Sequence, residues 1–113
     1  MPDELTKART LPHNLDAERS VLGAVLLDNH AFNAAGEILK AEDFYGEAHR
    51  VIFEAMSRLS ERGDAIDAVT LSEELGRQSG LERAGGSAYL SALVDGLPRA
   101  LNVAHYSRIV KDK

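Results

Sequence analysis

The chain of 113 residues contains no cysteine. Disulfides, thiolate nucleophiles, paired-cysteine redox motifs and cysteine-ligated zinc or iron–sulfur sites are therefore excluded. Apolar runs are short, as at Val25–Leu27, so the sequence offers no membrane span. Residues 1–11 carry charges of both signs without an apolar stretch, which excludes a secretory signal peptide. We expect a protein of the reducing cytoplasm.

Lysine is also scarce. Only four lysines accompany nine scattered arginines, while 18 acidic residues give a net charge of −5 and an isoelectric point near 5.3. A protein that binds DNA mainly through its phosphates usually carries a basic patch. Nonspecific DNA binding is therefore disfavoured as the main function of this chain.

Motifs for phosphate and metal binding are missing as well. A Walker A loop needs a Gly-Lys pair, and the sequence contains no such dipeptide. The histidines, His13, His30, His49 and His105, include no pair at i, i+4 spacing and no H-E-x-x-H motif. His13 and His30 lie at segment edges and are expected in solvent. His49 borders an apolar stripe beside Tyr45, so we expect a packed or hydrogen-bonded structural histidine.

Neighbouring carboxylates at Glu42/Asp43 and Glu73/Glu74 are the remaining candidates for acid–base chemistry. The first pair lies in a hydrophilic segment and Glu73 has a helix-capping role, so both pairs are expected on the solvated surface. The Gly85-Gly86 pair lacks the preceding strand of a nucleophile elbow and is expected to start a helix in a way that only glycine permits. We predict no catalytic, cofactor-binding or metal-binding residue in this chain.

Apolar residues recur at helical spacing along most of the chain. The clearest stripe, at 48, 51, 52, 55, 56 and 59, predicts a helix that Gly63 ends. Weaker patterns predict helices over about 15–27, 31–39, 71–78 and 87–95, and a last helix that follows Pro98. No window shows the alternation of a strand. We therefore predict an all-α fold, a single compact bundle of about six helices.

Local signals place the boundaries. Pro12 disfavours helical geometry at Leu11, so residues 1–11 are expected to form a flexible leader, with Asn14 capping the first helix. Asp16 and Glu18 would then occupy its first turn, where carboxylates are favoured. Thr70 and Glu73 have the spacing of a capping box that opens the 71–78 helix.

Gly23 lies inside the first predicted helix, where glycine costs about 1 kcal/mol relative to alanine. We expect it to mark a close approach by another helix. At the other end of the chain, the apolar stripe at 103, 106, 109 and 110 is still in progress at Lys113, with no glycine or proline after it. This pattern favours one module of a longer protein, with 102–113 as the start of a truncated helix.

A set of short motifs in a fixed order is more informative than any single residue. The set comprises L-P-H-N-L-D-A-E at 11–18, S-V-L-G-A at 20–24, L-D-N at 27–29, D-F-Y at 43–45, A-H-R at 48–50, I-F at 52–53, A-M at 55–56, I-D at 66–67, V-T-L at 69–71, G-G at 85–86, Y-L at 89–90, Asn102, Tyr106 and I-V at 109–110. In this order and spacing, residues 11–113 closely resemble the N-terminal domain of the bacterial replicative DNA helicases, the DnaB family.

The resemblance implies an all-α head domain, at 12–101, of a ring-forming parent protein. In that family six subunits surround DNA, and their N-terminal domains form a collar described as a trimer of dimers. The collar docks primase and contacts loaders and other replisome proteins. The ATP-dependent motor, with its ATP and magnesium, lies in a separate C-terminal domain. The parent is thus expected to be an ATP-dependent 5′-to-3′ DNA helicase, while this chain alone neither hydrolyses ATP nor unwinds DNA.

In the family a long helical hairpin that pairs between subunits follows the head, and it would begin near Asn102. We expect Val103 and Tyr106 to pack on the chain's own core. Ile109 and Val110 either do the same or continue into the hairpin. Tyr106, Ile109 and Val110 are therefore the candidate inter-subunit interface, and no motif identifies residues that contact primase. The family-matched residues expected in the core are Leu22, Phe44, Ile52, Phe53, Met56, Leu71 and Leu90.

Two other functions deserve comparison. A free-standing helical DNA-binding domain is the first, because the 70–78 helix follows a turn as in a helix-turn-helix. That helix carries Glu73 and Glu74 with only Arg77, a poor match to phosphate. A small helical enzyme is the second, and the missing nucleophile, metal and phosphate motifs oppose it.

Overall fold

Helices account for most of the computed structural model, which describes residues 2–77, 80–95, 97 and 102–112, with side chains from residue 15 onward. No strand occurs among these residues. The elements are α1 Pro2–Leu27, α2 Ala31–Ile38, the 3-10 helix η1 Ala41–Asp43, α3 Glu47–Arg62, α4 Ala68–Arg77, α5 Gly86–Ala92 and α6 Val103–Lys111. The predicted all-α fold with about six helices is confirmed.

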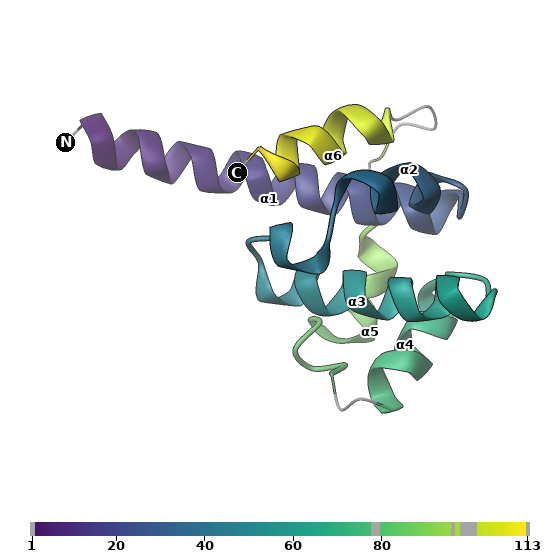
Figure 1. Ribbon diagram of the computed structural model, residues 1–113. Helices are drawn as coiled ribbons and strands as arrows, with labels where there is room; N and C mark the ends of the chain where they lie inside the picture. The colour runs from purple at the N-terminus through teal and green to yellow at the C-terminus, as the bar shows by residue number, and fades with distance from the viewer. Residues whose placement is uncertain (1, 78–79, 96, 98–101, 113) are drawn as a thin grey trace.

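The helices form two layers (Figure 1). Helix α6 packs on α1 and α2 in one layer, while α4 packs on α3 and α5 in the other, and contacts between α1 and α3 join the two. The N-terminal half of α1 projects beyond the rest of the molecule. With this projection included, the molecule measures 46 × 29 × 24 Å along its principal axes. No helix in the described part of the chain is long and apolar enough to cross a membrane.

Helix α1 begins much earlier than the sequence predicted. It runs from Pro2 through Pro12 without a break, so the expected helix start and the Asn14 cap are wrong. Proline inside a helix removes one hydrogen bond and costs about 3 kcal/mol. Residues 4–9 are nearly all strong helix formers and oppose that penalty. The division of the chain into a flexible leader at 1–11 and a head at 12–101 stays a prediction.

The core lies between the two layers and extends up to α6. All seven family-matched positions predicted to be core are at most 2% exposed, which confirms that prediction. Phe44 and Phe53 are buried in the core, and the Phe53 ring lies 4.9 Å from Phe44 and 5.3 Å from half-buried Phe32 between centroids. Such tilted pairs add to the energy of burial. Tyr45, which follows Phe44 in the segment between η1 and α3, is 57% exposed.

Glycine is needed at Gly23 because of a close contact and at Gly85-Gly86 because of the backbone conformation. A Cβ on Gly23 would collide with the backbone oxygen of Leu93 and the side chain of Leu97. The predicted close approach is thus confirmed, although the partner is the segment after α5. Gly85 and Gly86 have φ of 95° and 83°, which confirms a helix start that favours glycine.

The helix ends are set by local hydrogen bonds. Gly63 ends α3 in the left-handed conformation, as predicted, with φ of 79°. Helix α4 opens three residues before the predicted start, because Asp67 forms the box: its Oδ1 accepts from the Thr70 N–H at 2.8 Å, and Thr70 Oγ1 accepts from the Asp67 N–H at 2.9 Å. The predicted Thr70/Glu73 box is therefore wrong. Asn102 caps α6, while the predicted Pro98 start lies outside the described residues.

Candidate functional site

Helix α6, which carries the predicted interface residues, is packed on the chain's own head. Val110 is 1% exposed and belongs to the core. Val103, Tyr106 and Ile109 are half-buried against that core, which confirms the prediction for Val103 and Tyr106. Lys111 Nζ lies 3.3 Å from Asp43 and ties the end of the helix to η1. Contact of Tyr106, Ile109 or Val110 with a second subunit stays a prediction.

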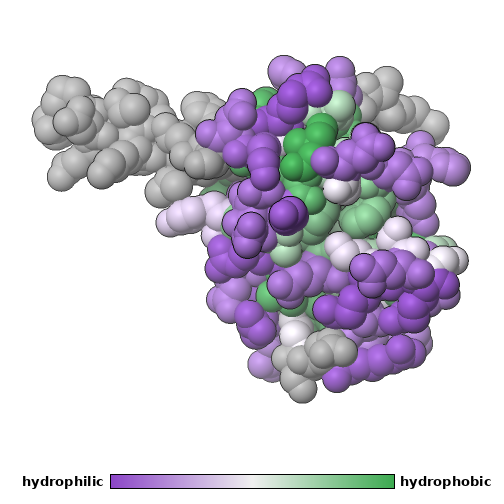
Figure 2. Space-filling view, in the orientation of Figure 1, coloured by the Kyte–Doolittle hydropathy of each residue, from purple (hydrophilic) through white to green (hydrophobic). Residues whose placement is uncertain are grey.

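The outer surface at this helix is partly apolar. Figure 2 shows an apolar strip, flanked by polar side chains, where α6 meets α2. Helices α2 and α6 carry half-buried side chains that pack against the core: Phe32, Ile38, Tyr106 and Ile109. Single apolar side chains at a surface are common, so this strip identifies no partner by itself.

A buried hydrogen-bonded chain links the two layers. Glu18 of α1 is 1% exposed, and its carboxyl oxygens accept from the Tyr45 N–H at 2.6 Å and the Gly46 N–H at 3.3 Å. His49 Nδ1 lies 2.7 Å from Glu18, and His49 Nε2 lies 2.6 Å from the Tyr89 hydroxyl. Since Glu18 accepts from its other partners, we assign the His49 hydrogen to Nδ1, which donates to Glu18, and Nε2 lies within hydrogen-bond distance of the Tyr89 hydroxyl.

These hydrogen bonds confirm His49 as a hydrogen-bonded structural residue and correct the expectation for Glu18. Glu18 is not in a first turn; it is a buried acceptor that joins α1 to His49 of α3, and His49 in turn contacts Tyr89 of α5. Positions 18, 49 and 89 share no periodic pattern, so sequence reasoning could not find their contact. Carboxylate, imidazole and hydroxyl follow the order of a nucleophilic relay. However, burial raises the pKa of the Tyr89 hydroxyl, with Arg19 acting in the opposite direction, so the hydroxyl is a poorer nucleophile.

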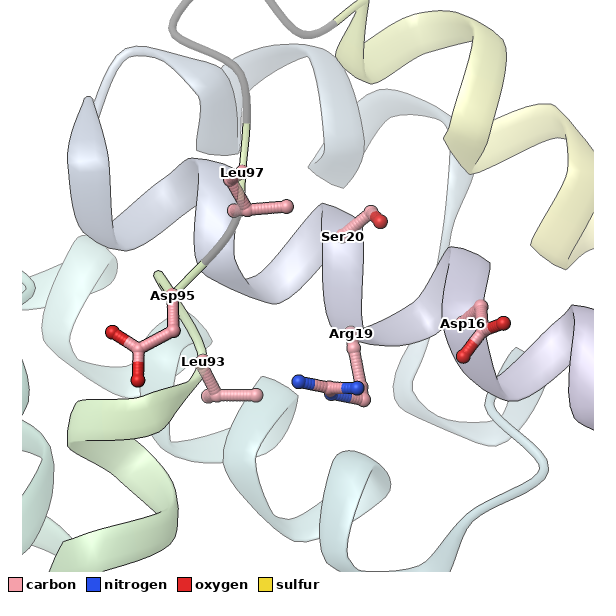
Figure 3. Close-up of a pocket in the computed structure, with 6 residues that line it drawn as sticks. All are labelled: Asp16, Arg19, Ser20, Leu93, Asp95 and Leu97. Carbon is pink, nitrogen blue, oxygen red and sulfur yellow. The ribbon is translucent and has the colours of Figure 1, made fainter.

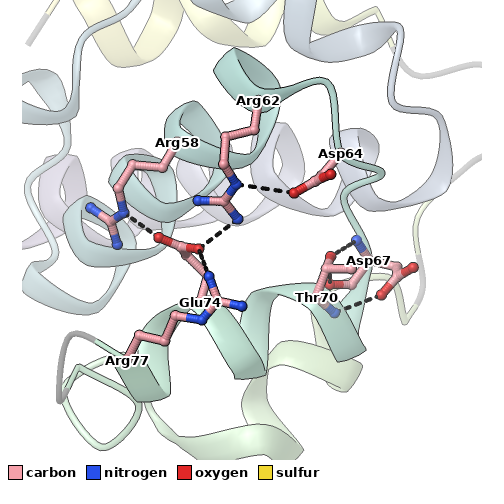
Figure 4. A network of polar contacts seen from close by, with 7 residues as sticks. All are labelled: Arg58, Arg62, Asp64, Asp67, Thr70, Glu74 and Arg77. Carbon is pink, nitrogen blue, oxygen red and sulfur yellow. Dashed lines mark hydrogen bonds and ion pairs between the residues drawn. The ribbon is translucent and has the colours of Figure 1, made fainter.

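A second polar network joins α3 to α4 (Figure 4). The Glu74 carboxylate, 2% exposed, accepts from Arg58 Nε at 2.6 Å and from Arg62 Nη2 at 2.8 Å. Arg77 lies 3.8 Å away, and Arg62 also donates to Asp64 at 3.1 Å. The hydrogen bonds from Arg62 and Arg58 lower the pKa of Glu74 from 4.5 to about 2, and those to Glu74 and Asp64 raise the pKa of Arg62.

The expectation that both Glu73 and Glu74 are solvated is therefore half wrong. Glu73 is exposed, but Glu74 lies on the buried face of α4 with Leu71 and Leu75. Its position three residues after Leu71 was the available signal, since residues i and i+3 share a helix face. Of the other pair, Glu42 is exposed, and Asp43 accepts the Lys40 N–H at 2.8 Å.

Beside α1 the surface is hollowed. Figure 3 shows a cavity of about 200 Å³ with Arg19 between Asp16 on one side and Leu93 and Asp95 on the other. Ser20 and Leu97 complete its lining. Its small size and mixed polarity do not match the large apolar pocket typical of a small-molecule site. Among the described residues, no group of three histidine, aspartate or glutamate side chains is placed to hold a metal ion.

Comparison with known proteins decides the family. A family model described as the DnaB-like helicase N terminal domain matches residues 10–112. The chain belongs to this family. The match covers the same stretch in which the sequence motifs resemble DnaB, so that identification is confirmed.

The DnaB relatives are similar over nearly the whole chain. The chain is 49% identical over 110 residues to the replicative DNA helicase DnaB of Geobacillus stearothermophilus. The aligned region covers 97% of this chain and 24% of that protein. It is also 49% identical over 111 residues to the DnaB of Treponema pallidum, covering 98% of this chain and 25% of the relative. The chain therefore spans about a quarter of the length of the DnaB proteins it matches.

A solved structure agrees with these sequences. The fold superposes with a TM-score of 0.83 on the crystal structure of the N-terminal domain of DnaB helicase from Mycobacterium tuberculosis. The two share 42% sequence identity over a region that covers 87% of this chain and 70% of that one. The all-α head is thus the DnaB N-terminal fold.

Proposed function

We propose that this chain is the N-terminal collar domain of a hexameric replicative DNA helicase that acts in DNA replication. The observation that carries the proposal is the 49% identity to a replicative DNA helicase over 97% of the chain, together with the N-terminal family model. In this role the domain contributes to ring assembly as a trimer of dimers. It docks primase, a helicase loader or other replisome proteins in the cytoplasm.

The motor activity is assigned to a separate C-terminal domain of the parent. That domain would bind ATP and magnesium and drive 5′-to-3′ unwinding of duplex DNA at the fork. The residues of this chain do not fit those groups. It has no Gly-Lys dipeptide, and carboxylates of Asp16 and Asp95 flank its α1 cavity, where they would repel a triphosphate.

DNA is expected to pass through the parent ring with little or no contact to this domain. The alternative, a free-standing DNA-binding domain, depends on basic residues near α4. There Arg58, Arg62 and Arg77 all lie against Glu74, and the chain as a whole carries a net charge of −5. A gel shift with duplex and single-stranded DNA should therefore show no stable complex; a salt-sensitive complex would favour the alternative.

Titration with the C-terminal domain of the cognate primase tests the proposal. Calorimetry and light scattering would be run on this chain and on a longer, dimeric version that continues through the hairpin. We expect saturable binding in the micromolar range or tighter, at least by the dimeric version, because a docking site between two subunits needs both. If the dimeric version fails to bind, primase docking is withdrawn and ring assembly alone is retained.

A further inference from the structure

Two hollows lie side by side along α1. The cavity at its middle is continued toward the C-terminal end by a second one of about 410 Å³, and Leu97 lines both. The segment after α5 crosses α1 at Gly23, where the missing side chain lets the backbone of Leu93 come close. We call the two hollows together the α1 groove. Its lining comprises Asp16, Arg19, Ser20, Leu27, Asp28, Leu93, Val94, Asp95 and Leu97.

The floor of the α1 groove is apolar and accessible. Leu27 is 52% exposed, one of the few large apolar side chains that reach solvent in this molecule. Val94 and Leu97 are half-buried, so they also present apolar surface to the groove. Covering these side chains would remove apolar area from water at about 25 cal/mol per Å².

The rim of the α1 groove is acidic. Exposed carboxylates line both hollows: Asp16 and Asp95 lie in the first one with the guanidinium of Arg19, and Asp28 lies in the second. Asp28 accepts the His30 N–H, and within the described part of the chain none of the three forms an ion pair. Elsewhere Glu74, Asp43 and Glu47 have basic partners. Among the described residues, the groove thus combines an apolar floor with a rim of three carboxylates and one guanidinium.

We infer that the α1 groove docks a cationic amphipathic segment of a partner protein. Apolar side chains of that segment would pack on Leu27 and Leu97, and its lysines or arginines would face Asp16, Asp28 and Asp95. An amphipathic helix in a groove is a common mode of peptide recognition, and complementary charge sets its specificity. This inference rests on the proposed function, in which the domain docks partner proteins, and it names the surface and the chemistry.

A designed probe gives a direct test. A fluorescent helical peptide of leucine and lysine, about 18 residues or five turns long, would be titrated by anisotropy, beside a leucine–glutamate peptide of the same pattern. The Asp16→Lys/Asp95→Lys variant should weaken binding of the lysine peptide at least about tenfold. The matched control Glu61→Lys/Glu82→Lys changes net charge equally at exposed sites outside the groove and should stay within about twofold.

The apolar floor is tested separately. Leu27→Ser should also weaken the lysine peptide, while Val69→Ser, at another exposed apolar residue, should not. Equal effects of the groove and control variants, or equal binding of the glutamate peptide, would overturn the inference. So would loss of self-association on Leu27→Ser in sedimentation, because the occupant would then be a second copy of this chain.

The same variants separate this inference from the proposed function. Suppose that the primase domain binds the Asp16→Lys/Asp95→Lys variant with unchanged affinity, and that the groove variants do not weaken binding of the lysine peptide. Primase then docks elsewhere, and only the groove assignment fails. If the dimeric version does not bind primase while the lysine peptide binds through the groove, the groove stands and primase docking fails.

Discussion

At the scale of single residues, the core of this small domain contains several buried polar and charged side chains. Glu18, His49 and Glu74 are each at most 4% exposed, and each has charged or hydrogen-bonding partners. Ser107 is the contrasting case: it is fully buried, and its hydroxyl has no hydrogen-bond partner among the described residues. A buried polar group without a partner costs stability, whereas a satisfied one is nearly neutral.

Ser107→Ala should therefore stabilise the protein, because it removes an unsatisfied hydroxyl and replaces serine with the best helix former. We expect a gain of about 1 kcal/mol in the free energy of unfolding, measured by urea denaturation. Ser60→Ala, at an exposed position of α3, is the control and should change stability by less than about 0.5 kcal/mol. A loss of stability on Ser107→Ala would mean that the hydroxyl has a partner.

Glu18→Gln should be costly despite its similar size. The amide group of glutamine must turn its NH₂ either toward the Tyr45 N–H, at the place of Oε2, or toward the Gly46 N–H and His49 Nδ1, at the place of Oε1, so one donor faces another. We expect a loss of about 1–3 kcal/mol in urea denaturation. The same change at exposed Glu61 should have little effect, and equal losses at the two sites would contradict the geometry described.

At the scale of elements, one carboxylate fastens α4 to α3. The pKa of Glu74 is held at about 2, below its ordinary 4.5, by the hydrogen bonds from Arg62 and Arg58. A depressed pKa in the folded state means that the interaction stabilises the fold above the unfolded pKa and is lost as the pH falls through the folded one. The contribution of Glu74 thus fades between about pH 4.5 and about pH 2.

Glu74→Gln should accordingly lower the Tm most at neutral pH. The difference in Tm between the wild type and the variant should shrink as the pH falls from about 4.5 toward 2, because Glu74 is then protonated in the wild type too. Thermal unfolding across that range provides the measurement. Glu73→Gln, on the exposed face of the same helix, is the control, and a constant Tm difference for Glu74→Gln would count against the network.

The close contact between α1 and the segment after α5 can be tested with glycine. Gly23→Ala places a Cβ against the Leu93 backbone, and overpacking of this kind costs about 1–3 kcal/mol. Gly76→Ala, in α4 with nothing within 4 Å of its Cβ, should instead stabilise by about 0.5–1 kcal/mol. Circular dichroism with urea would show the opposite signs; stabilisation by both changes would refute the close contact.

The elements with strong periodicity were predictable, and their long-range partners were not. The stripe of α3 and the αL glycine that ends it follow from sequence alone, because period and capping are local properties. Helix α1 was misjudged because Pro12 is a strong local signal that surrounding helix formers outweigh. The role of Glu18 was missed because its partners lie far away in sequence, whereas the burial of Glu74 had a local signal and only its arginine partners on α3 did not.

At the scale of the whole molecule, a single chain covers its own core. The core cluster runs from Ala17 in α1 to Val110 in α6, and α6 closes it from one side. The radius of gyration, 13.7 Å, is close to the roughly 13 Å expected for a folded domain of this length. The chain is therefore as compact as a typical single folded domain.

We expect the isolated chain to be a monomer or a weak dimer in dilute solution. This expectation rests on the proposed function, in which an inter-subunit hairpin that begins near Asn102 would hold the subunits together. Analytical ultracentrifugation over a range of concentrations is the measurement. A stable hexamer at micromolar concentration would show that the head alone assembles the ring.

The arrangement of the layers also determines which helices would carry a force applied to α6. Helix α6 lies against α1 and α2, and Lys111 near its end is tied to η1. A pulling force applied at the end of α6 would therefore be carried first by the layer of α1, α2 and α6. The layer of α3, α4 and α5 would feel that force only through its contacts with the first, such as the Glu18–His49 bond and the pairing of the Asn29 amide with the Ile66 backbone at 2.8 Å. Force on α6 would therefore strain α1 and α2 first, and it would reach α3 through η1 and through the bonds between the layers.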